Sequence, residues 1–184
     1  MPSAITHAVV GISSGLAVSK GSAPKRFWAL SMICAMLPDL DVLAFQFGFS
    51  YGNFWGHRGF FHSIFFAVVL GGIVATLFFR KEGIFSKSWL FYFLYFSIVS
   101  SSHGILDAFT NGGLGIALLS PFDNERYFFP ATPIYVSPLS VKEFISEKGI
   151  AILKNEILWV WVPSIFVAII GKTNYTHNAY KKLE

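Results

Sequence analysis

The chain has 184 residues, of which 54% are hydrophobic and only 13% are charged. An ordinary soluble domain carries about 25% charged residues, so this chain could not cover the surface of a soluble globule. The same composition excludes a disordered chain, a coiled coil and a collagen-like repeat. The single cysteine excludes a disulfide framework and a thiolate zinc cluster. The net charge of +4 comes from scattered basic residues, which argues against nucleic acid as a partner.

Uncharged stretches predict an all-α, polytopic membrane protein. Two stretches lack Asp, Glu, Lys and Arg over 21 and 19 consecutive residues, and roughly 20 apolar residues suffice to cross a bilayer. With three less regular apolar stretches, they predict a single domain, 1–184, built as a bundle of about five hydrophobic helices. In chain order these helices are expected at residues 3–19, 25–45, 59–79, 88–106 and 150–171.

Three parts of this bundle are expected to be irregular. The first helix is short, has Ser3 as its N-cap and lacks a basic segment before it, so we expect no cleavable signal peptide. We expect it to pack among the other helices or to be partly re-entrant. Two carboxylates interrupt the second helix, and the last one extends back past Lys154 and Glu156. Four prolines and several glycines predict an irregular outer cap at about 108–149, with one amphipathic helix near 139–149.

The basic residues predict which ends of the helices are cytoplasmic. Alternating helices place nine of them on one side, in short loops and the tail, and five on the other side among most of the acids. The positive-inside rule then places the short loops and the C-terminus in the cytoplasm, and the N-terminus, the 46–58 loop and the cap outside. The nine residues are Lys20, Lys25, Arg26, Arg80, Lys81, Lys87, Lys172, Lys181 and Lys182.

Seven ionisable side chains are expected at one level, near the outer ends of the first four helices. Such residues are unfavourable at membrane depth and are usually functional. Four imidazoles and three carboxylates make a nitrogen and oxygen ligand set that suits Zn, Mn, Fe or Mg. We therefore expect a metal cluster of one or two divalent ions near the non-cytoplasmic face, with zinc as the first choice. The seven residues are His7, Asp39, Asp41, His57, His62, His103 and Asp107.

Spacing predicts how two of the segments present their ligands. His103 and Asp107 are four residues apart, so both share one face of a helix. His57 and His62 are five residues apart, which does not fit a single helix face. A loop-to-helix transition is therefore expected between them.

Three residues are candidates for catalysis. Pro38 loosens the helix around Asp39 and Asp41, so this pair could chelate a metal together. Either carboxylate could instead be the general base. Arg58 is expected at the outer interface, where it could contact a phosphate through a bidentate interaction or simply extend towards lipid headgroups.

Arg126 is a second candidate for anion binding, and Gly112, Gly113 and Gly115 could present backbone N–H groups or make turns.

Four motifs occur in a fixed order along the chain. They are Thr6-His7, Leu37-Pro38-Asp39-Leu40-Asp41, His57-Arg58-Gly59-Phe60-Phe61-His62-Ser63 and His103-Gly104-Ile105-Leu106-Asp107. With them the chain resembles the YdjM-type family of inner-membrane metal-dependent hydrolases, also described as LexA-regulated. The resemblance runs from Thr6 to about Pro138 and implies a metal-dependent hydrolase without naming its substrate. A looser similarity to zinc-dependent phospholipase C, which gathers His and Asp from helices around a metal cluster, favours a phosphoester.

The expected function is hydrolysis of a phosphoester in a membrane lipid by a metal-activated water. Two alternatives remain open, a metal-ion transporter and a structural membrane protein stabilised by a metal. A transporter would need polar residues through the full membrane depth, whereas 70–79 and 89–97 contain no Asp, Glu, His, Lys or Arg. The expected partners are membrane lipids, and the sequence does not indicate an oligomeric state.

Overall fold

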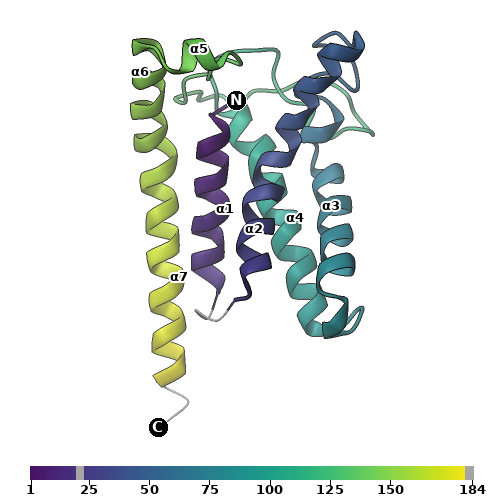
Figure 1. The fold of residues 1–184 in the computed structure, drawn as a ribbon, viewed down its shortest axis with the longest axis vertical. Coiled ribbons are helices and arrows are strands. Elements are labelled where there is room, and N and C mark those ends of the chain that lie inside the picture. The colour runs from purple at the N-terminus through teal and green to yellow at the C-terminus, as the bar shows by residue number, and fades with distance from the viewer. Residues whose placement is uncertain (20–22, 181–184) are drawn as a thin grey trace.

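Five helical rods lie side by side in the computed structural model, and rods consecutive in sequence run in opposite directions (Figure 1). The structure describes residues 1–19 and 23–180, with side chains up to residue 173. The described residues form no β-strand, which confirms the all-α prediction. The rods are α1 (Ala4–Val18), α2 (Lys25–Met36) continued by η1 (Leu37–Phe47), α3 (Ile64–Phe78), α4 (Lys87–Ala108), and α6 (Glu147–Glu156) continued by η4 (Ile157–Trp161) and α7 (Val162–Tyr180).

Three of the rods have the length and composition to cross a membrane, namely Lys25–Phe47, Lys87–Ala108 and Glu147–Thr173. The helices α1 and α3 have 15 residues each, fewer than the roughly 20 that a span requires. The first helix is therefore short, as predicted, but one continuous helix over 59–79 is wrong. The start of that segment forms the 3₁₀ turn η2 (Phe60–His62), and α3 begins only after Ser63, whose hydroxyl accepts from the Phe66 N–H at 3.0 Å.

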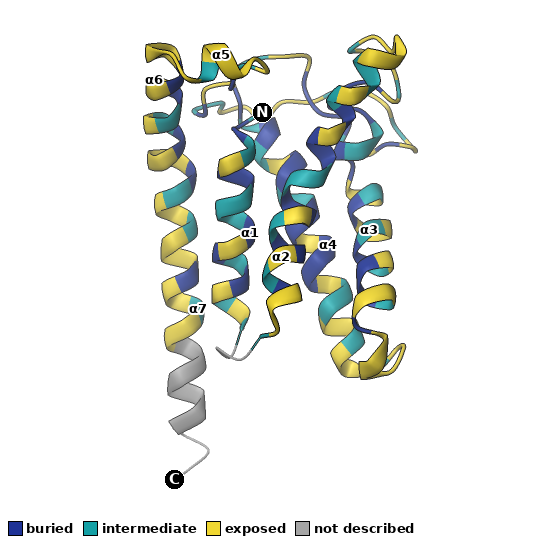
Figure 2. Ribbon diagram, viewed as in Figure 1, coloured by how far each residue is buried: buried dark blue, intermediate teal, exposed yellow. Residues whose placement is uncertain are grey.

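The rods pack through a buried apolar core in the half of the bundle away from the cap. The ring of Phe27 on α2 stacks on Tyr95 of α4 at 4.8 Å, and Phe79 stacks on Tyr92 at 3.7 Å. Close helix approach depends on small residues, since a Cβ at Gly11 of α1 would come within 2.5 Å of the Ser31 carbonyl on α2. The outward faces of the rods are largely exposed and apolar (Figure 2), as expected for surfaces that face lipid.

The connection between α4 and α6 forms an irregular cap over the end of the bundle that also holds the N-terminus (Figure 1). Its described structure consists of two isolated β-bridges, Thr110 with Ile134 and Ile116 with Tyr127, and one short helix, α5 (Val141–Phe144). A single amphipathic helix over 139–149 is therefore wrong. The chain turns after α5 so tightly that a Cβ at Gly149 would overlap the Phe144 carbonyl, and α6 then continues into the last rod.

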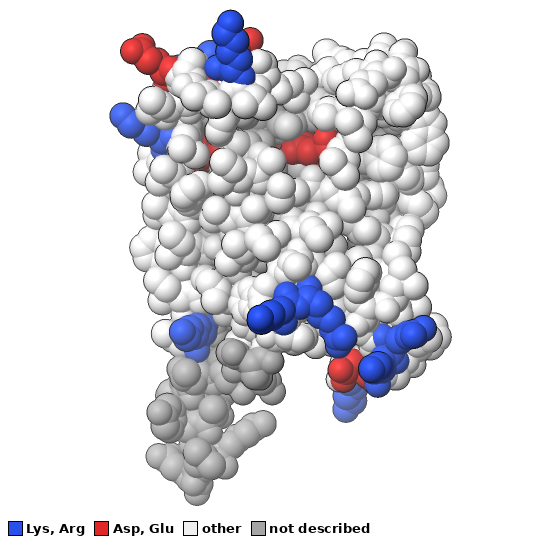
Figure 3. All heavy atoms as spheres, in the orientation of Figure 1, with Lys and Arg blue, Asp and Glu red and all other residues white. Residues whose placement is uncertain are grey.

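Basic side chains gather at the end of the bundle opposite the cap (Figure 3). This end holds the start of α2, the 3₁₀ turn η3 (Arg80–Glu82) and the start of α4. The predicted nine-residue basic side includes Lys20, Lys181 and Lys182, which lie outside the described residues. The remaining six basic residues lie at the end of the bundle away from the cap, so the charge pattern agrees with the alternating helix directions.

The orientation can be tested with reporter fusions at the two ends of the bundle. A fluorescent protein fused to the C-terminus should fluoresce, because the positive-inside rule places the basic end in the cytoplasm. Alkaline phosphatase inserted in the exposed 122–125 turn of the cap should be active. Phosphatase activity from the C-terminal fusion would contradict the orientation and move the cap to the cytoplasm.

Candidate metal centre

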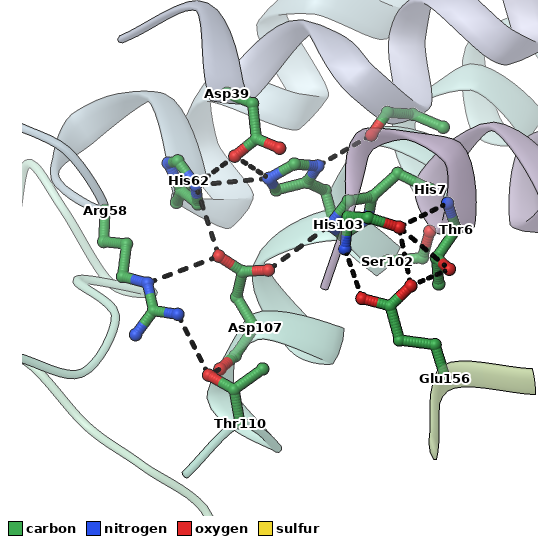
Figure 4. Close-up of polar contacts among 12 residues, drawn as sticks. Thr6, His7, Asp39, Arg58, His62, Ser102, His103, Asp107, Thr110 and Glu156 are labelled. Carbon is green, nitrogen blue, oxygen red and sulfur yellow. Dashed lines mark hydrogen bonds and ion pairs between the residues drawn. The ribbon is translucent and has the colours of Figure 1, made fainter. Parts of the chain in front are cut away.

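The structure brings all seven predicted side chains together at the cap end of the bundle, and none is more than 8% exposed. They come from α1, η1, the loop before α3 and α4, which are four segments far apart in sequence (Figure 4 shows most of them). Six of the seven divide into two groups that share His62, and His7 lies beside the first of them. The inner group is Asp39, His62, His103 and Asp107, and the second group is Asp41, His57 and His62.

The inner group has the spacing of a metal site. The His103 Nε2 atom lies 3.1 Å from Asp39 Oδ1 and 3.2 Å from His62 Nε2. The His62 Nε2 atom lies 3.6 Å from Asp39 Oδ1 and 3.5 Å from Asp107 Oδ2. Ligand atoms at about 2.0–2.1 Å from a tetrahedral ion are about 3.4 Å apart. These four distances are close to that value, and all the candidate ligand atoms of the group lie within 4.8 Å of one another, so the four side chains could hold one ion.

The hydrogen bonding of His103 also fits a metal ligand. Its Nδ1 atom lies 2.7 Å from the carbonyl oxygen of Ala35, and a carbonyl can only accept, so Nδ1 donates. In the neutral ring, Nε2 then presents a lone pair to the inner group. Histidine ligands commonly donate their second ring N–H to a backbone carbonyl in this way, which fixes the tautomer and the ring orientation.

Asp41 organises the second group. Its Oδ1 atom lies 2.6 Å from His57 Nδ1, and its Oδ2 atom lies 3.0 Å from His62 Nδ1 and accepts from the Arg58 N–H at 3.1 Å. Burial lowers the pKa of His57 despite the neighbouring Asp41 carboxylate, so this ring is neutral near pH 7. The His62 ring has one nitrogen facing each group and connects the two.

His7 borders the inner group from the other side. Its ring stacks on His103 with 3.8 Å between centroids, and its Nε2 atom lies 3.3 Å from Asp107 Oδ1. Asp107 therefore has His7 at one oxygen, and His62 and Arg58 at the other. His7 can either bind an ion or orient the Asp107 carboxylate.

Buried polar atoms that lack a hydrogen bond concentrate at this site, and several of them have only an ion-pair contact. A buried polar atom without a hydrogen bond is unfavourable by about 1–3 kcal/mol, and most such atoms among the described residues lie within the cluster. A divalent cation would supply the missing partner for the nitrogen and oxygen acceptors. The atoms are His7 Nε2, Asp39 Oδ2, Arg58 Nε, His62 Nδ1, Asp107 Oδ1, Asp107 Oδ2 and, outside the cluster, Ser100 Oγ.

Local sequence features explain why these side chains converge. Pro38 is the second residue of the 3₁₀ helix η1, in which residues i and i+3 are aligned, so Asp39 and Asp41 point to different sides. The two aspartates therefore belong to different ligand groups, and the structure does not bring them together as the chelating pair that their spacing allowed. On α4, a Cβ at Gly104 would come within 2.3 Å of the His62 carbonyl. Glycine there allows the loop to approach α4, while the loop-to-helix transition at His62 is confirmed.

Arg58 lies in the interior and not at the expected outer interface. Its side chain is fully buried, with Nε 3.5 Å from Asp107 Oδ2 and Nη2 donating to Thr110 Oγ1 at 2.9 Å. Its Nη1 atom donates to the Gly112 carbonyl, and the φ of +92° at Gly113 lets the backbone close over the guanidinium. The reading in which Arg58 extends to lipid headgroups is therefore wrong, because the buried Asp107 carboxylate holds it inside.

Arg126 joins the cap to the loop that precedes α3. The Arg126 guanidinium donates to the carbonyls of His57 at 2.9 Å, Tyr51 at 3.0 Å and Asn53 at 3.2 Å. These bonds fasten the cap to the loop that carries His57. The cap thus holds in place the loop with His57, which belongs to the second group of ligands.

Glu156 is a buried carboxylate that the sequence analysis did not select as a site residue. It is fully buried in the last rod and accepts hydrogen bonds from Ser3 and Thr6, next to His7 (Figure 4). In the sequence, Glu156 is a carboxylate within an apolar stretch. The prediction extended the last helix past this residue and gave it no role in a site.

Two apolar grooves flank η1, and each reaches one aspartate. The Asp39 groove, of about 590 Å³, lies between the start of α1, η1 and the 137–144 segment. The Asp41 groove, of about 520 Å³, has aromatic walls that include Phe47, Trp55 and Phe61. Figure 3 shows an acidic spot in a hollow of the upper part of the molecule, surrounded by uncharged atoms and apart from the charged side chains at the upper left. The histidines and Asp107 line neither groove.

A family model described as YdjM inner membrane protein matches residues 1–180 and so includes every residue of both groups. The chain belongs to the YdjM family. The Escherichia coli (strain K12) protein described as inner membrane protein YbcI is 39% identical over 170 residues, which is 91% of this chain and 95% of that protein. No solved structure matches the chain. The resemblance expected from the four motifs is confirmed, and this YdjM-family chain is an inner membrane protein with a buried His and Asp group that could hold a metal ion.

Proposed function

We propose that this YdjM-family protein is a membrane-bound, metal-dependent hydrolase that cleaves a phosphoester of a membrane lipid. One observation carries the proposal. A buried quartet of nitrogen and oxygen ligands has one member, Asp39, in the wall of an apolar groove. The orientation predicted from the basic residues places this centre on the non-cytoplasmic side of the membrane.

The ligand set supports zinc as the first choice of ion, with manganese, iron or magnesium as alternatives. In the inner quartet, His62, His103 and Asp107 would hold one ion and leave a position for water beside Asp39, and the second group would offer Asp41, His57 and the other ring nitrogen of His62 to a second ion. When bound, a divalent ion would supply an acidified water and polarise the phosphoryl group.

The remaining chemistry is assigned to the side chains themselves. Asp39 has Oδ1 turned to His103 and a buried Oδ2 atom without a partner. We assign Asp39 Oδ2 as the base that takes the proton of the attacking water. Asp41 orients His57 and His62, and Arg58 holds Asp107 in place and balances its charge. Arg58 is therefore a positioning residue in this proposal.

The walls of the Asp39 groove support a lipid substrate. Ile5, Ile33 and Leu40 line it and are each at least half exposed, so the groove is open towards the lipid-facing surface. An acyl chain can lie against these side chains without leaving an apolar environment. The phosphoester of the same lipid would then reach Asp39 from the membrane side.

Turnover by the purified protein tests this function. Zinc-loaded protein in mixed vesicles should release a phosphorylated or dephosphorylated product from at least one glycerophospholipid in a headgroup panel, detected by mass spectrometry. A chelator should abolish release, and added zinc should restore it. Absence of turnover across the panel, together with metal flux into protein-containing liposomes, would contradict the hydrolase and favour a transporter.

A further inference from the structure

Glu156 forms a polar cluster of its own between the last rod and the start of α1. Its Oε1 atom accepts from the Ser3 N–H, and its Oε2 atom accepts from the Ser3 and Thr6 hydroxyls, each at 2.6 Å. No Lys or Arg among the described residues forms an ion pair with it. Three donors at the N-terminus of α1 therefore stabilise this carboxylate, in the position that the helix dipole favours for an anion.

The last rod changes its winding directly after Glu156. Residues Ile157–Trp161 form the π turn η4, in which the Val162 N–H donates to the Ile157 carbonyl five residues earlier. This repeat brings residues five apart to one face, so Trp161 lies on the same side as Glu156. The Trp161 Nε1–H donates to Thr6 Oγ1 at 2.8 Å. Thr6 is thus held by two side chains of one distorted turn, and π turns of this kind are frequent at functional sites.

The cluster adjoins the candidate metal centre through a single residue. Thr6 precedes His7, whose ring stacks on His103 and whose Nε2 atom faces Asp107 (Figure 4). A shift of the first turn of α1 would therefore move the His7 ring relative to both residues. The contact of His7 Nε2 with Asp107 Oδ1 at 3.3 Å links the ring to the metal centre.

We propose that Glu156 is a positioning residue for His7 and, through His7, for the Asp107 side of the metal centre. The effect on metal binding rests on the proposed metal centre, whereas the placement of His7 does not. Glu156 contacts neither group of ligands directly, so its influence should pass through Thr6 and His7 alone.

The test compares Glu156→Gln with a matched control on the same helix, Glu147→Gln, whose side chain is exposed. The glutamine keeps the size of the side chain but turns one acceptor into a donor that faces Ser3 or Thr6. Zinc affinity is measured by competition with a coloured chelator, and the His7 ring is followed by ¹⁵N NMR, with its signals assigned by their loss in His7→Ala. Glu156→Gln should weaken zinc binding about tenfold and shift the His7 signals, whereas Glu147→Gln should change neither.

The double variant with His7→Ala separates positioning from general stability. If Glu156 acts through His7, Glu156→Gln should cause no further loss of zinc affinity once His7 is absent. An equal loss in both backgrounds, or unchanged His7 signals, would overturn the proposal. Trp161→Phe removes the indole donor to Thr6 with a small loss of ring volume and should shift the same signals, so the link from this turn through Thr6 to His7 can be tested even where Glu156→Gln does not fold. Wild-type protein that binds no zinc would contradict the metal centre, and the His7 signals would still decide the placement.

Discussion

A double variant, His62→Ala with His103→Ala, should lose its bound metal while the protein still inserts in the membrane. The two Nε2 atoms lie 3.2 Å apart at the centre of the inner quartet, and both rings are buried. Losing even a residue behind a metal ligand weakens metal binding about 10–100-fold, so losing two ligands should remove the ion under ordinary purification. The measurement is metal content per chain by mass spectrometry.

The control for this experiment is Ser102→Ala, one residue from His103 on α4. The Ser102 hydroxyl donates to the Val99 carbonyl within its own helix, and Ser102 belongs to neither group of ligands. It should therefore leave metal content unchanged. Size-exclusion chromatography of a fluorescent fusion shows whether each variant is folded. A folded double variant with full metal occupancy would contradict the ligand assignment.

The convergence of the seven ionisable residues could be predicted from the sequence because an apolar chain leaves them few positions. Helices of alternating direction bring His7, His62 and His103 to the same end, whichever helices are neighbours. The alternating helix directions therefore determine at which end of the bundle the site lies. It did not determine which side chains touch, because contact depends on the rotation of each helix about its axis.

The parts that the sequence did not predict depend on contacts between distant segments. Asp39 and Asp41 separate because η1 winds as a 3₁₀ helix, and no residue type specifies that winding unambiguously. Arg58 is buried because Asp107 and Thr110, about 50 residues later, receive its guanidinium. Glu156 has its partners about 150 residues earlier. Pairings at such separation leave no periodic pattern in the sequence.

The two aspartates of η1 should respond differently to the same substitution. Asp39→Asn removes the charge of the side chain with the unpartnered Oδ2 atom but keeps its size. If Asp39 is the base, turnover should fall about 10²–10⁴-fold, while the two histidines and Asp107 still hold the metal. The measurement pairs turnover of the lipid substrate with metal content of the same sample. A loss of metal together with activity would make Asp39 a required ligand and contradict the assignment as base.

Asp41→Asn is the matched variant two residues away. Its carboxylate holds His57 at 2.6 Å and His62 at 3.0 Å, so the amide should loosen both rings and weaken zinc binding about 10–100-fold. Because the base is intact, excess zinc should restore most of the turnover in Asp41→Asn, whereas Asp39→Asn should stay inactive at any zinc concentration. The opposite result would be turnover of Asp39→Asn restored by zinc, and an Asp41→Asn protein that binds its full zinc but is inactive. Asp41 would then be the base and Asp39 the residue that supports metal binding, because the proton of the water would be taken up on the Asp41 side of η1.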